Sequence, residues 1–242
     1  MTNWSKLQHA YGSAADLPAF LGALSPNAED PVWNEVWGRV CHQGTVYSAS
    51  APVLPYLLPA AREWPPAARV MPLSLAGAIA ISPNVLGNHD LQPYRSTIEE
   101  LHRLATETTA SIGLSSTDFI YLLQAVLALE GDLLWGQHLH RLASGEFEGK
   151  CTSCGIGLLV GVGQYGSFVA SEDWVNKPTA PRNPLQPSGV EDLDETARRL
   201  HNYALAASQE EVAQWVPYIF GVGACPACGK SFEVAKAIAA VD

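Results

Sequence analysis

The amino-acid sequence predicts a mainly α protein, an α-solenoid of antiparallel helix pairs followed by a small four-cysteine module. Residues 1–145 read as successive helices separated by short Gly, Pro and Ser breaks. Paired helices recur at about 35 to 45 residues, which fits an α-solenoid better than a four-helix bundle. The pattern changes near residue 145, and four of the five cysteines lie beyond it in two Cys-x-x-Cys pairs. We therefore expect two domains, residues 1–145 and 146–242.

The composition is that of a globular protein with a substantial core. Of the 242 residues, 48% are hydrophobic and 16% are charged. The formal net charge is -10, from 24 acidic and 14 basic residues. This balance argues against nucleic-acid binding, because phosphate contacts need clustered Lys and Arg. It suits a protein partner with a basic surface.

Nothing in the sequence indicates secretion or membrane insertion. The segment Met1–Lys6 lacks the apolar core of a secretory signal. The longest apolar stretches, Leu73–Ile81 and Phe119–Leu129, are shorter than the ~20 residues that cross a bilayer. Cysteines paired as metal ligands, rather than as disulfides, also fit a reducing compartment. We expect a cytoplasmic protein.

The first helices are predicted from their caps and apolar spacing. Ser13-x-x-Asp16 resembles a capping box and opens a helix through Leu24. The next helix has Asp30 at its N-cap and Pro31 at its first position, where proline is tolerated. Its apolar residues form one stripe with i, i+3, i+4, i+7 and i+8 spacing. They are Trp33, Val36, Trp37, Val40 and Cys41.

Five further helices complete the predicted solenoid. Ser115 or Ser116 caps the fourth of them, whose positions Phe119–Leu129 are apolar nearly all round, as in a central buried helix. The five segments cover approximately residues 51–62, 65–81, 94–104, 116–129 and 132–142. The prolines and glycines between them mark the connecting turns.

The C-terminal module is predicted to contain short strands, a proline-rich connector and a helical hairpin. Strand-like runs cover residues 147–150, 156–162 and 231–234. Prolines 178, 181, 184 and 187 recur at the polyproline II period, which predicts an extended strap packed along its own domain. An SH3-type ligand is the alternative. The helical hairpin follows, with Leu193, Ala197, Leu200 and Ala204 on one face.

The two cysteine pairs have the pattern of zinc knuckles. Cys151-Thr-Ser-Cys154-Gly and Cys225-Pro-Ala-Cys228-Gly each place two sulfurs on one tight turn. The glycine that follows each pair permits the positive φ of that turn. Together, Cys151, Cys154, Cys225 and Cys228 predict one structural Zn²⁺ with four sulfur ligands and no open position.

Three alternatives use the same cysteines. Iron is possible because a rubredoxin-like centre has the same knuckles. Thioredoxin-like chemistry needs a Cys-x-x-Cys at the start of a helix in a βαβ unit, and disulfides are disfavoured in a reducing compartment.

The two cysteine pairs are separated by residues 155–224, a far longer segment than in a simple four-cysteine motif. We therefore interpret residues 164–222, strap and helical hairpin, as an insertion in a zinc ribbon.

Histidines offer a second candidate site. His138-x-His140, with His102 and the His89-Asp90 pair, is the best grouping for a metal-dependent hydrolase. Positions i and i+2 of a helix face different sides, so the first pair cannot chelate a metal there. The sequence also lacks a His-Glu-x-x-His motif, a Gly-x-Ser-x-Gly elbow and a phosphate loop. We predict no catalytic residues.

Several segments resemble a family of bacterial HEAT-repeat proteins with a C-terminal four-cysteine module. The similar segments are 9–14, 33–47 with Trp33 and Trp37, 148–155, 172–174 and 218–229. The resemblance implies a HEAT-like solenoid and a binding role. Some members of this family are encoded near secreted polymorphic toxins, which implies toxin immunity.

These observations favour a non-catalytic protein-binding module. The most specific hypothesis is a cytoplasmic immunity protein that neutralises a secreted toxin, with a basic, nucleic-acid-targeting toxin domain as its partner. A scaffold or regulatory protein unrelated to toxins is the alternative. An enzyme with a histidine-based second metal site is the third hypothesis.

Overall fold

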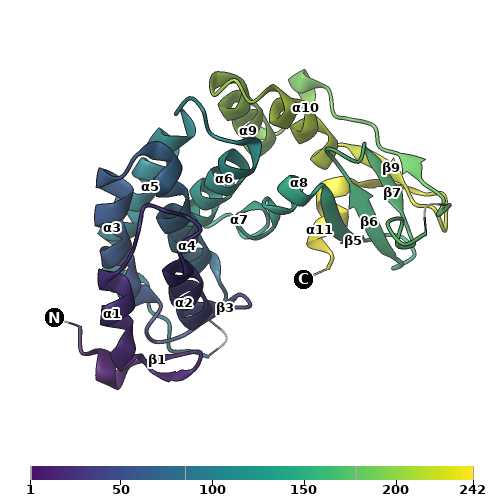
Figure 1. The fold of residues 1–242 in the computed structure, drawn as a ribbon. Coiled ribbons are helices and arrows are strands. Elements are labelled where there is room, and N and C mark those ends of the chain that lie inside the picture. The colour runs from purple at the N-terminus through teal and green to yellow at the C-terminus, as the bar shows by residue number, and fades with distance from the viewer. Residues whose placement is uncertain (1, 85, 178, 242) are drawn as a thin grey trace. The chain divides into compact units, whose positions relative to one another are not determined.

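The computed structural model describes residues 2–84, 86–177 and 179–241. The chain forms two compact units, Met1–Leu139 and His140–Asp242, which are described separately (Figure 1). No helix within the described ranges is both long and apolar enough to span a membrane.

The first unit contains seven α-helices within its described residues. They are α1 (Leu17–Gly22), α2 (Pro31–Val40), α3 (Leu54–Glu63), α4 (Val70–Ile81), α5 (Arg95–Thr109), α6 (Ser116–Glu130) and α7 (Trp135–His138). Two predicted caps are confirmed. The Asp30 carboxylate accepts a hydrogen bond from the Val32 N–H at 3.0 Å, and the Ser115 hydroxyl accepts one from the Asp118 N–H at 3.1 Å. These contacts satisfy N–H groups that have no partner within the helix.

The core of the first unit lies around α6, which packs against α4, α5 and α7. Most α6 side chains from Phe119 to Leu129 are buried, so the prediction of a central buried helix is confirmed. The crossing with α4 is close, because a Cβ atom on Gly77 would lie 3.0 Å from the Ala125 Cα atom. A small residue at this crossing lets the two backbones approach.

Two short β-hairpins interrupt the helices of the first unit. β1 (Gln8–His9) pairs with β2 (Gly12–Ser13), and β3 (Cys41–His42) pairs with β4 (Thr45–Val46). Gln43 and Gly44 form the second turn with φ values of 50° and 78°. Positive φ at both central residues of a two-residue turn matches the twist of paired strands. The chain therefore leaves the helix at Val40, and buried Cys41 belongs to a strand.

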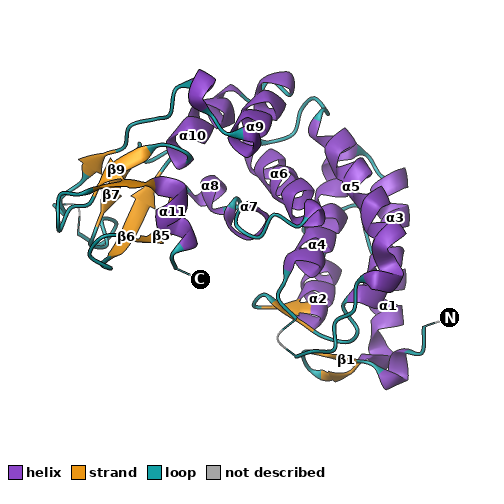
Figure 2. Ribbon diagram, turned by 180° about the vertical axis from the view of Figure 1, so that it is seen from behind, coloured by secondary structure: helices purple, strands orange, loops and turns teal. Residues whose placement is uncertain are grey.

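The second unit combines an antiparallel sheet with helices (Figure 2). The sheet order is β5 (Glu146–Lys150), β6 (Gly157–Gly161), β7 (Phe168–Ala170) and β8 (Asn183–Pro184). A separate hairpin pairs β9 (Val222–Ala224) with β10 (Ser231–Glu233). The helices are α8 (Arg141–Ser144), α9 (Glu195–Ala206), α10 (Glu210–Ile219) and α11 (Val234–Ala239). The predicted helical hairpin is confirmed as α9 and α10.

The segment between the cysteine pairs takes part in the sheet. It contributes β7 and β8, and Gln186 forms an isolated antiparallel bridge with Val222 of β9. Pro184 of the predicted strap lies in β8, so this part of the segment is an extended strand paired with β7. Pro178, another proline of the predicted strap, lies outside the described residues.

The predicted fold class, a HEAT-like α-solenoid, is wrong. The structure is about 52% helical and 13% strand, with four small sheets. The segment 132–142 is not one helix: the single turn α7 lies within it, and a second single turn, α8, begins at Arg141. The solenoid prediction rests on the spacing of predicted helices along the sequence, and this spacing reports local periodicity alone. The pairing of β6 with β7, and of β7 with β8, joins segments whose short strands carry little periodicity of their own.

Candidate metal centre

The four cysteines lie in the turns of two β-hairpins. Cys151 directly follows β5, and β6 begins at Gly157. In the same way Cys225 directly follows β9, and β10 begins at Ser231. Each strand pair thus fixes both ends of a short turn. We call residues 151–156 the first knuckle and residues 225–230 the second knuckle.

The two knuckles have the same backbone hydrogen bonds. In the first, the Cys151 N–H donates to the Ile156 carbonyl and the Gly155 N–H donates to the Cys151 carbonyl, both at 2.9 Å. The second knuckle repeats both bonds at 2.9 Å, from Cys225 to Lys230 and from Gly229 to Cys225.

Glycine is required at one position of each knuckle. The φ angles are +75° at Gly155 and +71° at Gly229. In this left-handed region a Cβ atom crowds the backbone, and glycine has none. The glycine after each Cys-x-x-Cys pair therefore lets the chain turn back into the second strand.

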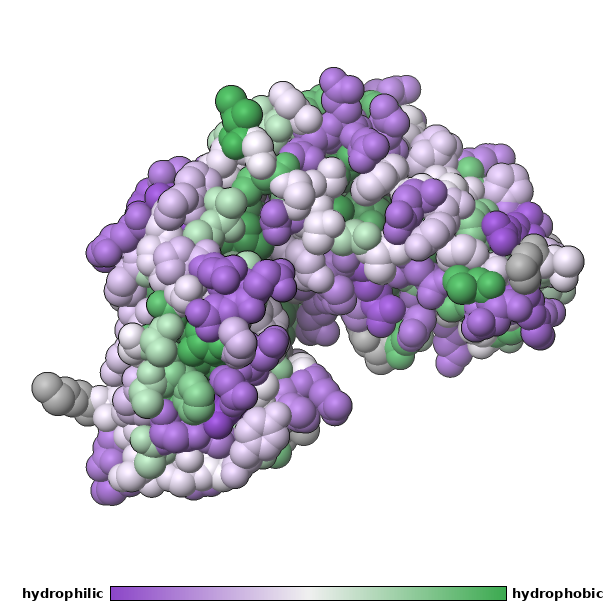
Figure 3. Space-filling view, in the orientation of Figure 1, coloured by the Kyte–Doolittle hydropathy of each residue, from purple (hydrophilic) through white to green (hydrophobic). Residues whose placement is uncertain are grey.

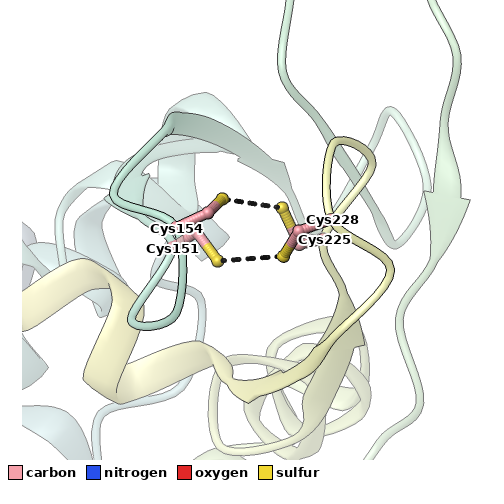
Figure 4. Close-up of side chains that lie close together, drawn as sticks. All are labelled: Cys151, Cys154, Cys225 and Cys228. Atoms are coloured by element: carbon pink, nitrogen blue, oxygen red, sulfur yellow. Dashed lines mark hydrogen bonds between the residues drawn. The ribbon is translucent and has the colours of Figure 1, made fainter.

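The knuckles bring all four sulfurs together (Figure 4). The Cys151 and Cys228 sulfurs are 3.9 Å apart, and those of Cys154 and Cys225 are 3.8 Å apart. All four ligand atoms lie within 4.8 Å of one another. A disulfide needs about 2.05 Å, so these thiols are not bonded to each other. A tetrahedron with metal–sulfur bonds of about 2.3 Å has edges of about 3.8 Å. The four cysteines are close enough to hold one metal ion.

Exposure differs within each knuckle. The first cysteine is buried, with 3% exposure at Cys151 and 0% at Cys225, whereas Cys154 and Cys228 are exposed. Helix α11 packs on β5 beside the first knuckle, where a Cβ atom on Gly149 would lie 3.4 Å from the Ala237 carbonyl oxygen. The site is therefore closed on one side by the unit's core and open to solvent on the other.

The sulfurs influence each other's ionisation. The N–H groups of Cys154 and Ser153 donate to the Cys151 sulfur and lower its pKa to about 6. The Ile156 N–H donates to the Cys154 sulfur and lowers the pKa of Cys154. Desolvation and the neighbouring sulfurs of Cys151, Cys228 and Cys225 have the larger, opposite effect, and they raise the pKa of Cys154 to about 11. One thiolate is thus stabilised by backbone dipoles, and a second beside it requires a compensating cation.

The candidate histidines occupy separate places. The His89 ring is buried with its Nε2 atom 3.0 Å from the Ile79 carbonyl oxygen, and burial lowers its pKa. The His102 Nε2 atom lies 2.9 Å from a Glu130 carboxylate oxygen. Across the described parts of the chain, the four cysteines are the one group of three or more Cys, His, Asp or Glu side chains placed to share a metal ion. Among the described residues, His138 and His140 belong to no second such group.

Asn183 is a residue of this region that sequence reasoning missed. Its side-chain amide in β8 donates to the Ala224 carbonyl at 2.9 Å, directly before Cys225. This bond connects the four-stranded sheet to the hairpin of the second knuckle. No local pattern marks Asn183, because its partner is 41 residues away.

Comparisons of this chain with protein-family models, with curated proteins and with solved structures found no match.

Proposed function

We propose that the four cysteines bind one structural Zn²⁺ ion and that the chain is a non-catalytic binding protein. The observation that carries the metal assignment is the pair of sulfur–sulfur distances, 3.8 and 3.9 Å, between the two knuckles. They are close to the edge of a tetrahedron of sulfurs around Zn²⁺, about 3.8 Å.

The donor set favours zinc in a structural role. Four thiolates complete the tetrahedron and leave no position for a water or a substrate, which a catalytic zinc site keeps open. Iron takes the same ligands, and the coordination geometry alone does not separate the two metals. Zn²⁺ has no redox chemistry and no visible absorption, so a visible absorption spectrum and elemental analysis distinguish a zinc site from an iron site.

The role of the ion is to hold the second unit together. Cys151 and Cys228 are separated by 77 positions in the sequence, and a metal that binds both closes the long loop between them. Closing such a loop reduces the entropy of the unfolded chain. The ion therefore stabilises β8, α9 and α10, which lie within the loop, together with the two hairpins.

Metal content tests this proposal directly. Native mass spectrometry and elemental analysis of the purified chain should give one zinc per chain, lost on denaturation. A visible thiolate–iron absorption band would assign iron instead. Two tightly bound ions per chain would instead support the hypothesis of a hydrolase with a second, histidine-based metal site. The candidate ligands of that site are His89, Asp90, His102 and His138.

We propose further that the chain binds a protein with a basic surface. Its net charge of -10 supports this partner class, because complementary charge speeds association and discriminates between partners. On the face drawn in Figure 3, hydrophobic residues form small groups among hydrophilic ones. Such small hydrophobic groups fit a largely polar contact with the partner.

Toxin immunity is the specific form of this binding role. If the gene next to that of this chain encodes a toxin, co-expression should protect cells from it, and the two proteins should associate more slowly at high salt. Full toxicity during co-expression, together with no association between the purified proteins, would contradict immunity. A scaffold or regulatory role would then be the better proposal.

A further inference from the structure

The two cysteines of each knuckle differ in a way that coordination does not require. Cys154 and Cys228 are exposed, whereas Cys151 and Cys225 are buried. An oxidant in solution therefore reaches the second sulfur of each knuckle first.

Each exposed sulfur faces a buried sulfur of the other knuckle. Cys228 lies 3.9 Å from Cys151, and Cys154 lies 3.8 Å from Cys225 (Figure 4). These separations exceed a disulfide bond of about 2.05 Å by less than about 2 Å. A bound metal ion keeps the sulfurs apart at the edges of its tetrahedron, and its departure lets the facing sulfurs approach.

We propose that the centre is a peroxide-sensitive switch in which disulfides between the knuckles, Cys151–Cys228 and Cys154–Cys225, replace the metal ion. This inference rests on the proposed metal centre. The oxidant is hydrogen peroxide or another hydroperoxide, which the solvent supplies.

The chemistry balances for each pair. The Cys228 thiolate attacks one oxygen of the peroxide, the O–O bond breaks, and hydroxide leaves and becomes water on protonation. The Cys151 thiolate then attacks the sulfur of the resulting sulfenic acid. The S–O bond breaks, and a second hydroxide leaves and becomes water. Two thiolates are oxidised to one disulfide, and one peroxide is reduced to two waters.

The consequence is release of the metal without separation of the knuckles. A first disulfide removes two of the four thiolates, and the two that remain bind Zn²⁺ weakly. A bond between knuckles still closes the loop from residue 151 to residue 228. Disulfides within each knuckle would instead leave that loop open. The connectivity therefore decides whether the second unit keeps its fold after oxidation.

The experiment uses the purified wild-type chain, with its metal content measured first. Hydrogen peroxide is added in steps while a zinc-binding dye records released metal, and the oxidised chain is digested with trypsin without reduction. Cleavage after Lys150, Arg182, Arg199 and Lys230 gives peptides 151–182 and 200–230, one for each knuckle. We expect one zinc released per chain and these two peptides joined. A thiol reductant with added Zn²⁺ should reverse both changes.

The Cys41→Ser variant is the matched control, because this buried thiol lies in the first unit and should leave both readouts unchanged. Retention of zinc while the cysteines are oxidised to sulfinic acid would overturn the switch. So would two separate peptides, each lighter by two hydrogen atoms, since these contain disulfides within a knuckle. A chain purified without any metal would overturn the proposed metal centre itself, which is a different failure.

Discussion

The Cys151 and Cys228 sulfurs lie 3.9 Å apart although 77 positions separate them in the sequence. Cys154 and Cys225 repeat this relationship at 3.8 Å. The first sulfur of each knuckle thus faces the second sulfur of the other, so the contact between the two knuckles is reciprocal. This arrangement underlies the proposed metal centre and leads to testable predictions.

Replacing one exposed ligand should release the metal. In Cys228→Ser, a hydroxyl replaces a thiolate, and we expect less than one tenth of the wild-type zinc to remain after dialysis against a chelator. Without the ion that closes the loop, the melting temperature should fall by roughly 10 °C. Elemental analysis and thermal unfolding measure the two effects. Cys41→Ser should keep its zinc. Unchanged zinc content in Cys228→Ser would exclude the four-sulfur centre.

The turn of the first knuckle should favour glycine at residue 155. Its φ of +75° makes Gly155→Ala cost about 1 kcal/mol of unfolding free energy and weaken zinc binding several-fold. Gly157→Ala is the matched control, because Gly157 has no positive φ and a Cβ atom there meets nothing within 4 Å. Denaturant unfolding and competition with a zinc chelator measure the difference. Equal effects of the two substitutions would contradict a local turn requirement.

Close packing of α7 on α6 should make Gly136 sensitive to substitution. A Cβ atom there would lie 2.7 Å from the Ala128 Cα atom, so backbone must move to accept it. We expect Gly136→Ala to destabilise the chain by about 2 kcal/mol in denaturant unfolding. Gly22→Ala in α1, where a Cβ atom meets nothing within 4 Å, should be neutral or slightly stabilising. A neutral Gly136→Ala would mean that α7 does not pack in this way.

Glu100 should contribute stability that depends on pH. Arg103, at 3.0 Å, and Arg62, at 3.2 Å, lower the pKa of Glu100 from 4.5 to about 2. Since the folded-state pKa lies below the unfolded one, the contribution is complete above pH 4.5 and is lost as pH falls towards 2. At pH 7, Glu100→Gln should melt roughly 1–3 °C lower than wild type, a small effect because both arginine side chains are more than half exposed to solvent.

The melting-temperature difference caused by Glu100→Gln should narrow progressively between pH 4.5 and pH 2. Loss of metal in acid affects wild type and variant alike, so the comparison at each pH isolates Glu100. Glu99→Gln, which removes a single exposed pair with Arg95, is the control and should change the melting temperature less. A difference that stays constant down to pH 2 would contradict the lowered pKa.

Local patterns predicted much of the secondary structure. Asp30 and Ser115 cap helices as expected because a cap depends on a side chain and an N–H group a few residues apart. The β-hairpin at Gln43 and Gly44 was missed because the apolar stripe of the preceding helix continues through Cys41. An apolar residue at position 41 fits the buried end of a helix and a buried strand equally well. Periodicity does not distinguish these two structures over so short a segment.

The sequence by itself determined the two Cys-x-x-Cys-Gly turns, because the positive φ of Gly155 and Gly229 and the hydrogen bonds of each knuckle involve neighbours within six residues. The two motifs also predict that the four sulfurs share one ion, but only the tertiary structure decided which contacts bring the two turns together. That pairing depends on contacts such as Asn183 with Ala224 and Gln186 with Val222, between segments 41 and 36 positions apart. The free energy of such contacts must exceed the entropic cost of closing a long loop. A short sequence pattern does not show whether it does.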